Sequence, residues 1–194
     1  QADGATSTAL MILALRKMGA QVEYLVPDRF KYGYGLTPAI ADLAFTSFTP
    51  DLLITVDNGI SSHDGVKQAQ DHGMQVIITD HHLTTKPTPS AQAVVNPNQL
   101  GCDFPSKALA GVGVAFYVLA NLSTYRKKLH KSSAVMSQYL DLVALGTYAD
   151  VASLDYNNRI LVDVGLKRIQ QHLCRPGISA LLEIAGREAA TLKA

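Results

Sequence analysis

Two short apolar segments, each followed at once by an aspartate, constrain the fold more than any other feature of this sequence. Residues 52–56 lead into Asp57-Asn58-Gly59, and residues 76–79 lead into Asp80-His81-His82. Residues 61–72, between them, have the pattern of a helix. Strands that are apolar on both faces and alternate with helices belong to parallel sheets that helices cover on both sides. The sequence therefore predicts an α/β domain with a parallel sheet.

A similar alternation runs through the first half of the chain and gives way to helices in the second half. We expect helices at 6–18 and 37–45, strands at 21–26 and 93–95, and a loop at 27–36. Beyond residue 105 the pattern becomes mostly helical. The helices expected there span residues 107–122, 132–147, 158–171 and 178–185.

The start of the sequence carries a prediction about domain organisation. Residue 1 is Gln rather than Met, and a polar, glycine-containing turn follows it with no strand before it. We expect a fragment: an α/β domain of residues 1–155 that lacks its first strand, then a helical connector of residues 156–194. Loss of an interior strand leaves backbone groups unpaired, so we expect this fragment to be poorly stable.

Polar residues that follow parallel strands are candidates for a binding site, because ligands bind at the carboxyl ends of such strands. Asp57 and Asp80 have this position. Asp3 resembles a third strand end, and Asp150 follows a further apolar segment. Taken singly, Asp57 also fits a turn, Asp3 a helix cap and Asp150 a helix end. Together the four aspartates indicate a site.

The histidines beside Asp80 indicate what such a site would bind. His81 and His82 directly after a buried strand are an expensive arrangement without a ligand. Clustered carboxylates repel one another unless a cation neutralises them. Carboxylate oxygens with one or two imidazoles suit Mn²⁺ or Mg²⁺ better than structural zinc. We therefore predict a divalent metal site, and two ions there would suit phosphoryl chemistry.

Composition limits the class of protein. The net charge of +1 gives no overall indication of nucleic-acid binding, which must then depend on local basic groups. Cys102 and Cys174 are the only cysteines, and two isolated thiols suit a reducing compartment, so we expect a cytoplasmic protein. The apolar run 109–122 is too short to span a bilayer, so we expect no membrane segment.

Several segments together resemble one protein family. Asp80-His81-His82, with the segment around Asp57, resembles the motifs of the DHH phosphoesterase superfamily. Within it the chain is similar to the RecJ-type exonucleases, which are specific for single-stranded DNA. The segments that carry the resemblance run in family order over nearly the whole chain: 2–7 (ADGATS), 29–36 (RFKYGYGL), 56–62 (VDNGISS), 79–83 (TDHHL), 109–116 (LAGVGVAF), 145–151 (LGTYADV) and 158–161 (NRIL).

The resemblance implies a set of metal ligands. Asp3, Asp57, His81 and Asp150 would bind two divalent ions, with Asp57 bridging them. Mn²⁺ would be preferred, with Mg²⁺ as the alternative. Gln1 stands where the family has an aspartate, and an amide binds divalent cations less strongly than a carboxylate does.

The resemblance also implies roles for residues that would face the substrate. His82 would contact the scissile phosphate, and Asp80 would mainly orient the histidines. Arg29 and Tyr34 would hold the 5′ end of the DNA. Arginine can grip a terminal phosphate with two hydrogen bonds, and tyrosine can stack on a nucleotide.

The activity implied is hydrolysis of single-stranded DNA from its 5′ end, in DNA repair and recombination. Single-stranded DNA would be the main partner, a single-strand-binding protein a further candidate, and the full-length protein a monomer. The family's C-terminal substrate-binding domains have no counterpart in the sequence, so we expect this chain alone to be inactive or weak.

Two other functions stay open at this point. The chain could be a different DHH enzyme, acting on short oligonucleotides, cyclic dinucleotides or pyrophosphate. It could also be a non-catalytic nucleic-acid-binding relative that has lost its metals, for which Gln1 is the only support.

Overall fold

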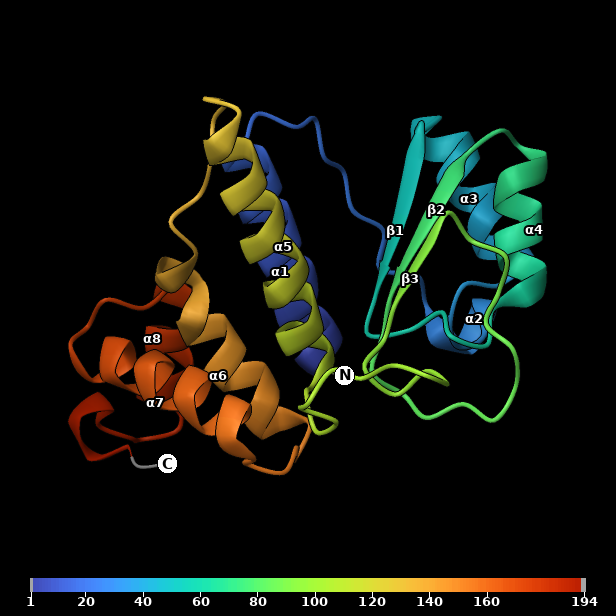
Figure 1. The fold of residues 1–194 in the computed structure, drawn as a ribbon. Coiled ribbons are helices and arrows are strands. Elements are labelled where there is room, and N and C mark those ends of the chain that lie inside the picture. Colours follow the sequence, from blue (N-terminus) through green and yellow to red (C-terminus); the bar gives the residue numbers. More distant parts are fainter. Residues whose placement is uncertain (1, 193–194) are drawn as a thin grey trace.

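A three-stranded parallel sheet with helices on both faces forms the first half of the molecule, as a computed structural model describing residues 2–192 shows. The strands are β1 (Leu52–Val56), β2 (Gln75–Thr79) and β3 (Ala93–Val95), in the order β1-β2-β3. Leu53 pairs with Val76, which sets the register of β1 and β2. In Figure 1, α3 (Pro38–Phe48) and α4 (His63–Asp71) cover one face of the sheet. On the other face lie α1 (Ala2–Lys17) and α5 (Gly111–Lys128).

Successive side chains of β1 point to opposite faces, and this alternation divides the core in two. Leu53 packs into a cluster with α3 and α4 that includes Val76 and Ile78 of β2, both fully buried. Ile54 and Val56 face the larger cluster formed by α1, α5 and the later helices. Burial on both faces explains why these strands are apolar throughout.

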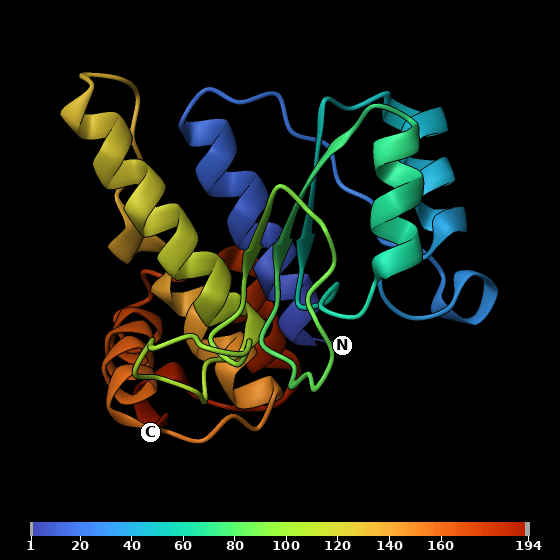
Figure 2. The same cartoon turned by 45° about the vertical axis from the view of Figure 1, so that its right-hand side comes forward.

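The second half of the chain packs against α1 and α5, and the helices there gather beside this pair in Figures 1 and 2. Val143, Val162 and Ile178, one from each of the three main helices, lie in the same core cluster. Each buried side chain of this size contributes about 1.5–3 kcal/mol. The helices are α6 (Leu140–Ala149), α7 (Tyr156–Gln170) and α8 (Pro176–Ile184), with short 3-10 helices at Met136–Tyr139 and Ala189–Thr191.

The described helices give no candidate for a membrane-spanning segment: within residues 2–192, none combines enough length with enough apolar character to cross a bilayer.

The prediction of an α/β fold with a parallel sheet is confirmed, and the strands expected at 52–56 and 93–95 have those bounds. The strand expected at 21–26 is wrong, because this segment is irregular. Tyr24 and Val26 are exposed there, and no strand of the described chain lies beside them to pair with. A strand needs a neighbour for its backbone groups, which a local pattern cannot reveal.

Other differences concern element boundaries. The loop expected at 27–36 contains a short helix, α2 (Arg29–Tyr32), because the Asp28 side chain caps it by accepting a hydrogen bond from the Phe30 amide. The helix expected at 107–122 begins at Gly111, and the one expected at 132–147 is a 3-10 helix followed by α6. The expected boundary between residues 155 and 156 stays a prediction.

Candidate metal centre

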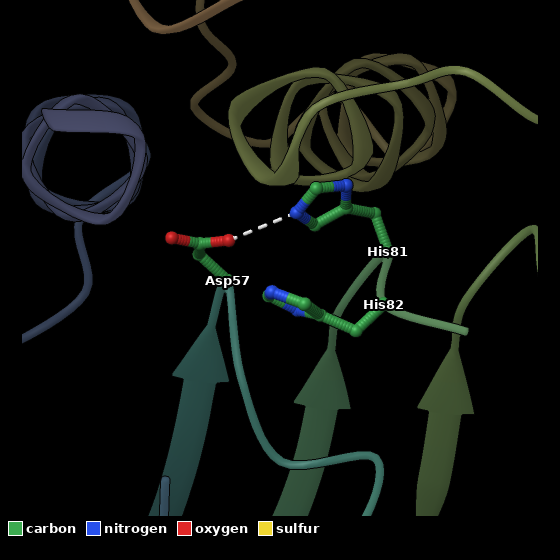
Figure 3. Close-up of side chains that lie close together, drawn as sticks. All are labelled: Asp57, His81 and His82. Atoms are coloured by element: carbon green, nitrogen blue, oxygen red, sulfur yellow. Dashed lines mark hydrogen bonds and ion pairs between the residues drawn. The ribbon is translucent and has the colours of Figure 1, made fainter. Parts of the chain in front are cut away.

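Asp57, His81 and His82 meet at the carboxyl ends of β1 and β2, where Figure 3 shows them facing one another. Asp57 follows β1 directly, and the two histidines come one and two residues after Asp80 at the end of β2. The Nε2 atom of His81 lies 3.1 Å from Oδ1 of Asp57. The ring centroids of the histidines are 4.5 Å apart. Parallel strands thus place three potential ligands at one sheet edge, as the sequence predicts.

Two helices add a carboxylate each to this cluster. Asp3 lies in the first turn of α1 and is fully buried, with Oδ2 3.8 Å from Nε2 of His81. Asp150 follows the last residue of α6, and its Oδ2 lies 3.8 Å from Nδ1 of His81. His81 is therefore the centre of the cluster, with carboxylates facing both ring nitrogens. The predictions about Gln1 and about a strand before Asp3 concern positions outside the described residues.

Close approach of the backbone to Asp57 depends on particular residues. Asp57 itself has a φ of 58°, a left-handed conformation that aspartate tolerates better than most residues. A Cβ atom on Gly111 would lie 2.7 Å from Cβ of Asp57, and one on Gly4 would lie 3.3 Å from its Oδ2. Glycines in α1 and α5 therefore give the carboxylates their space.

Asp3 connects the site to α5. Its Oδ2 accepts a hydrogen bond from the Gly111 amide at 2.7 Å, and its Oδ1 accepts one from the Val112 amide at 2.9 Å. These amides begin a helix whose N-terminus favours negative charge. Burial and the nearby charge of Asp57 nevertheless raise the pKa of Asp3 to about 6. A cation bound beside Asp3 would offset this unfavourable charge.

The surroundings of His81 also favour positive charge. Burial lowers the pKa of His81, but the hydrogen bond to Asp57 and the charges of Asp150 and Asp3 outweigh burial, so the net shift is upward. The environment that stabilises an imidazolium ion here is the same one that would stabilise a metal ion.

Asp80 organises the loop that carries the histidines rather than facing the cluster. Its carboxylate is buried, and Oδ1 lies 2.7 Å from Nδ1 of His82. Oδ1 also accepts hydrogen bonds from the His81 and His82 amides, and Oδ2 accepts one from the Ile60 amide at 2.9 Å. This geometry leaves Nε2 of His82 directed away from Asp80.

Of the two predicted substrate residues, Tyr34 contacts the cluster. The Tyr34 hydroxyl lies 3.3 Å from Nε2 of His82 and donates to the Asp57 carbonyl at 3.3 Å. Burial, followed by the charge of Asp57, raises the pKa of Tyr34 to about 12. Arg29 is exposed on α2, five residues earlier.

The donor atoms present fit a divalent cation. Asp57, His81 and His82 offer ligand atoms within 4.8 Å of one another, and so do Asp3, His81 and Asp150. The two groups share His81. Oxygen-rich donors with imidazole and without thiolate suit Mn²⁺ or Mg²⁺. The individual roles assigned to these residues stay predictions, although the fold brings the predicted ligands together.

Sequence reasoning missed two amides behind the site. Asn96 and Asn98, one and three residues after β3, donate hydrogen bonds to the carbonyls of His82 and His81, respectively. The available signal was their place after a third strand, because polar residues there share the edge with Asp57.

Sequence reasoning also missed an acidic partner of a histidine outside the site. His72 lies 2.6 Å from Asp42 of α3 and stacks on Phe45.

Known proteins with similar sequences share this arrangement of segments. The chain is 52% identical over 200 residues to the "Single-stranded-DNA-specific exonuclease RecJ" of Escherichia coli, covering 100% of this chain and 34% of that protein. It is 40% identical over 188 residues to the Bacillus subtilis protein of the same name, covering 95% of this chain and 22% of that protein. The chain thus spans about a third or less of these relatives.

Solved structures agree with the fold. The structure titled "Crystal structure of exonuclease RecJ bound to manganese" matches with a TM-score of 0.82 and 36% identity, over 97% of this chain and 46% of that chain. A Thermus thermophilus RecJ in complex with Mn²⁺ matches with a TM-score of 0.77 and 34% identity, over 97% of this chain and 26% of that chain.

The family match covers the sheet and every candidate site residue except Asp150. The model described as "DHH family, N-terminal domain" matches residues 1–147, a span that includes Asp57, the Asp80-His81-His82 triplet and most of α6. Sequence, fold and the geometry of these residues therefore agree, and the chain belongs to the DHH family.

Proposed function

We propose that this chain is the metal-dependent phosphodiesterase core of an exonuclease that degrades single-stranded DNA from the 5′ end, in DNA repair and recombination. Two divalent ions would serve it, with Mn²⁺ preferred and Mg²⁺ as the alternative. The observation that carries the proposal is the convergence of three carboxylates, those of Asp3, Asp57 and Asp150, on the ring nitrogens of His81 at 3.1–3.8 Å.

The roles of the site residues are part of this proposal. A carboxylate has two oxygens, so Asp57 would be the ligand that both ions share, and Asp3 and Asp150, which face His81 with it, would complete the acidic side. Divalent ions held there would activate water and neutralise the charge that develops on the phosphate. The chain positions the three carboxylates, because they lie in or directly after regular elements: Asp3 in α1, Asp57 after β1 and Asp150 after α6.

His82 and Asp80 act as a pair toward the substrate in this proposal. Asp80 holds Nδ1 of His82 at 2.7 Å, which fixes the ring and leaves Nε2 to meet the scissile phosphate. The Tyr34 hydroxyl, 3.3 Å from that Nε2, marks where the substrate would lie. Arg29, exposed on the same connecting segment, would reach the terminal 5′ phosphate.

Further expectations depend on the whole protein. The matched region makes up 34% and 22% of these two relatives, so we infer that this chain alone acts weakly and that further domains complete the DNA-binding groove. We also propose a cytoplasmic location, consistent with the two free cysteines, a monomeric full-length protein and a single-strand-binding protein as a partner. No observation favours a cyclic-dinucleotide enzyme or a non-catalytic module.

A chimera tests the function directly. This chain replaces the matching segment of the Escherichia coli RecJ, and Mn²⁺-dependent release of nucleotides from 5′-labelled single-stranded DNA is measured. We expect activity, and we expect Asp57→Ala to abolish it. Asp51→Ala is the matched control, since Asp51 is exposed at the opposite end of β1 and should have no effect. A chimera that folds and binds Mn²⁺ but leaves the DNA intact would contradict the proposed substrate.

A further inference from the structure

The two peptide units that carry the histidines have hydrogen-bond partners on both sides. The amides of His81 and His82 donate to Oδ1 of Asp80 at 2.7 and 3.2 Å. The carbonyl of His81 accepts a hydrogen bond from Nδ2 of Asn98 at 2.6 Å. The carbonyl of His82 accepts one from Nδ2 of Asn96 at 3.0 Å. Asp80 therefore fixes the amide side of this loop, and the two asparagines fix the carbonyl side.

The asparagines are themselves held in place. Asn96 is 1% exposed, and its Oδ1 accepts a hydrogen bond from the Asn98 amide at 2.8 Å. Nδ2 of Asn98 also donates to the Lys107 carbonyl at 3.2 Å. The Lys107 ammonium in turn donates to the Pro97 carbonyl at 2.6 Å. Hydrogen bonds therefore hold residues 96–98 in place. Asn98 connects the loop of His81 and His82, called the histidine loop below, to the segment that leads into α5.

Such support matters because the histidine loop has no secondary structure of its own. His81 and His82 follow β2 in irregular backbone, so no ladder of strand hydrogen bonds sets the direction of their rings. The distance of 3.1 Å between His81 and Asp57 depends on the orientation of the peptide that Asn98 holds. Groups around a metal need positions fixed to within about 0.5 Å to work.

We propose that Asn98, supported by Asn96, is a positioning residue of the metal centre: it holds the His81 peptide so that the ring meets the cation together with Asp57. The inference rests on the proposed function only in taking the cluster to bind a divalent ion. Partners that orient a metal ligand change metal affinity by about 10–100-fold when they are removed.

The test measures Mn²⁺ binding alone, by electron paramagnetic resonance, in the full chain and in parallel in the chimera. Asn98→Leu keeps the side-chain size and removes the donors. We expect Mn²⁺ to bind about tenfold or more weakly, with an altered line shape of the bound ion. Gln99→Leu is the matched control, because Gln99 donates to the Val94 carbonyl at 3.2 Å in the same segment without touching a histidine. Its Mn²⁺ affinity should equal that of the unchanged chain.

A second variant keeps the test decisive if Asn98→Leu fails to fold. Asn98→Ala removes both side-chain donors and adds neither bulk nor charge. Weaker Mn²⁺ binding by Asn98→Ala, at an unchanged affinity of Gln99→Leu, is the expected result. Equal Mn²⁺ affinities for the unchanged chain, Asn98→Ala and Gln99→Leu, at matched thermal midpoints, would overturn the proposal.

The result is separable from the proposed activity. If the chimera binds Mn²⁺ and leaves DNA intact, the activity is wrong, while the effect of Asn98→Leu on Mn²⁺ affinity still decides this inference. If DNA is degraded but Asn98→Leu binds Mn²⁺ normally, the inference is wrong and the activity stands. Absence of Mn²⁺ binding by the unchanged chimera would overturn both.

Discussion

Asp57 combines two unfavourable features at one residue. Its backbone is left-handed, with a φ of 58°, and its side chain is buried beside Asp3. Strained backbone and crowded charges persist only where the surrounding structure holds them, and they gather at functional sites. The apolar register of β1, with Ile54 and Val56 packed in the core, is what holds Asp57 in this position. Asp57 is therefore an unfavourable position that the surrounding fold holds in place.

Space for the carboxylates should be as critical as their charge. A Cβ atom added by Gly111→Ala would lie 2.7 Å from Cβ of Asp57 and 3.0 Å from Oδ2 of Asp3. We expect Gly111→Ala to cost about 1–3 kcal/mol and to weaken Mn²⁺ binding, measured by urea unfolding and metal titration. Gly113→Ala, in the same helix, would meet only the Leu109 side chain, at 3.1 Å. An equal loss of Mn²⁺ affinity in both variants would contradict this account.

Local sequence predicted some site residues and missed others for a physical reason. Asp57, Asp80 and the histidines follow apolar strands, so the pattern that predicts the sheet also predicts their common edge. Asn98 and Gly111 act through contacts with residues far away in the chain, and Gly111 reaches Asp3 across 108 positions. The place of Asn98 after β3 indicates only the shared sheet edge, and no local pattern encodes its contact with His81 or that of Gly111 with Asp3.

At the scale of elements, Asp3 makes the start of α5 sensitive to pH. Its pKa rises from 3.8 to about 6 on folding, because burial and Asp57 disfavour its ionised form. The folded state then binds a proton more tightly than the unfolded state does. The stabilisation from that proton is complete below about pH 4 and is lost as pH rises through about 6.

The raised pKa of Asp3 can be tested by comparing the stability of the wild type and of Asp3→Asn, both without metal. The free energy of unfolding of the wild type, relative to Asp3→Asn, should fall as pH rises from 4 to 7, because only the wild type titrates at this position. Urea unfolding at several pH values checks it. A constant difference across this range would show that Asp3 titrates normally.

A buried ion pair holds α8 against α6. The guanidinium group of Arg175 contacts the fully buried carboxylate of Asp141, which also accepts a hydrogen bond from the Arg175 amide at 2.9 Å. We expect Arg175→Met to cost about 3–5 kcal/mol, since it leaves a buried charge without its partner. Lys167→Met breaks an exposed pair with Asp163 at 2.7 Å and should cost about 1 kcal/mol or less. Similar urea midpoints for the two variants would contradict the prediction.

Element boundaries show the same limit on sequence reasoning as the site residues. The strands at 52–56 and 93–95 were predictable because apolar runs end in polar residues. The segment 21–26 has a strand-like composition, but pairing depends on a neighbour that the described chain does not provide. The start of α5 is set by Asp3 from another helix, so the pattern around residue 107 placed it too early.

At the scale of the whole molecule, the site joins the sheet to helices α1 and α6. Asp57 and the histidines follow β1 and β2 (Figure 3), whereas Asp3 lies in α1 and Asp150 at the end of α6. The ligands assemble only when the sheet and these helices are folded together. Metal binding should therefore stabilise the whole fold.

The stabilisation by Mn²⁺ depends on its concentration relative to its dissociation constant. Mn²⁺ at a hundred times its dissociation constant should raise the free energy of unfolding by about 2.7 kcal/mol. Asp57→Asn should remove the effect while leaving the metal-free protein folded, because asparagine also tolerates the left-handed conformation. Thermal unfolding with and without Mn²⁺ measures it. An equal shift in the variant would place the bound ion elsewhere.

The most direct test of the central claim is the anomalous scattering of manganese in crystals of this chain grown with Mn²⁺. We expect two peaks at the carboxyl ends of β1 and β2, both in contact with the cluster of Asp3, Asp57, His81 and Asp150. Peaks only at other positions, or an ordered cluster without manganese at saturating Mn²⁺, would contradict the claim that this sheet edge is a metal centre.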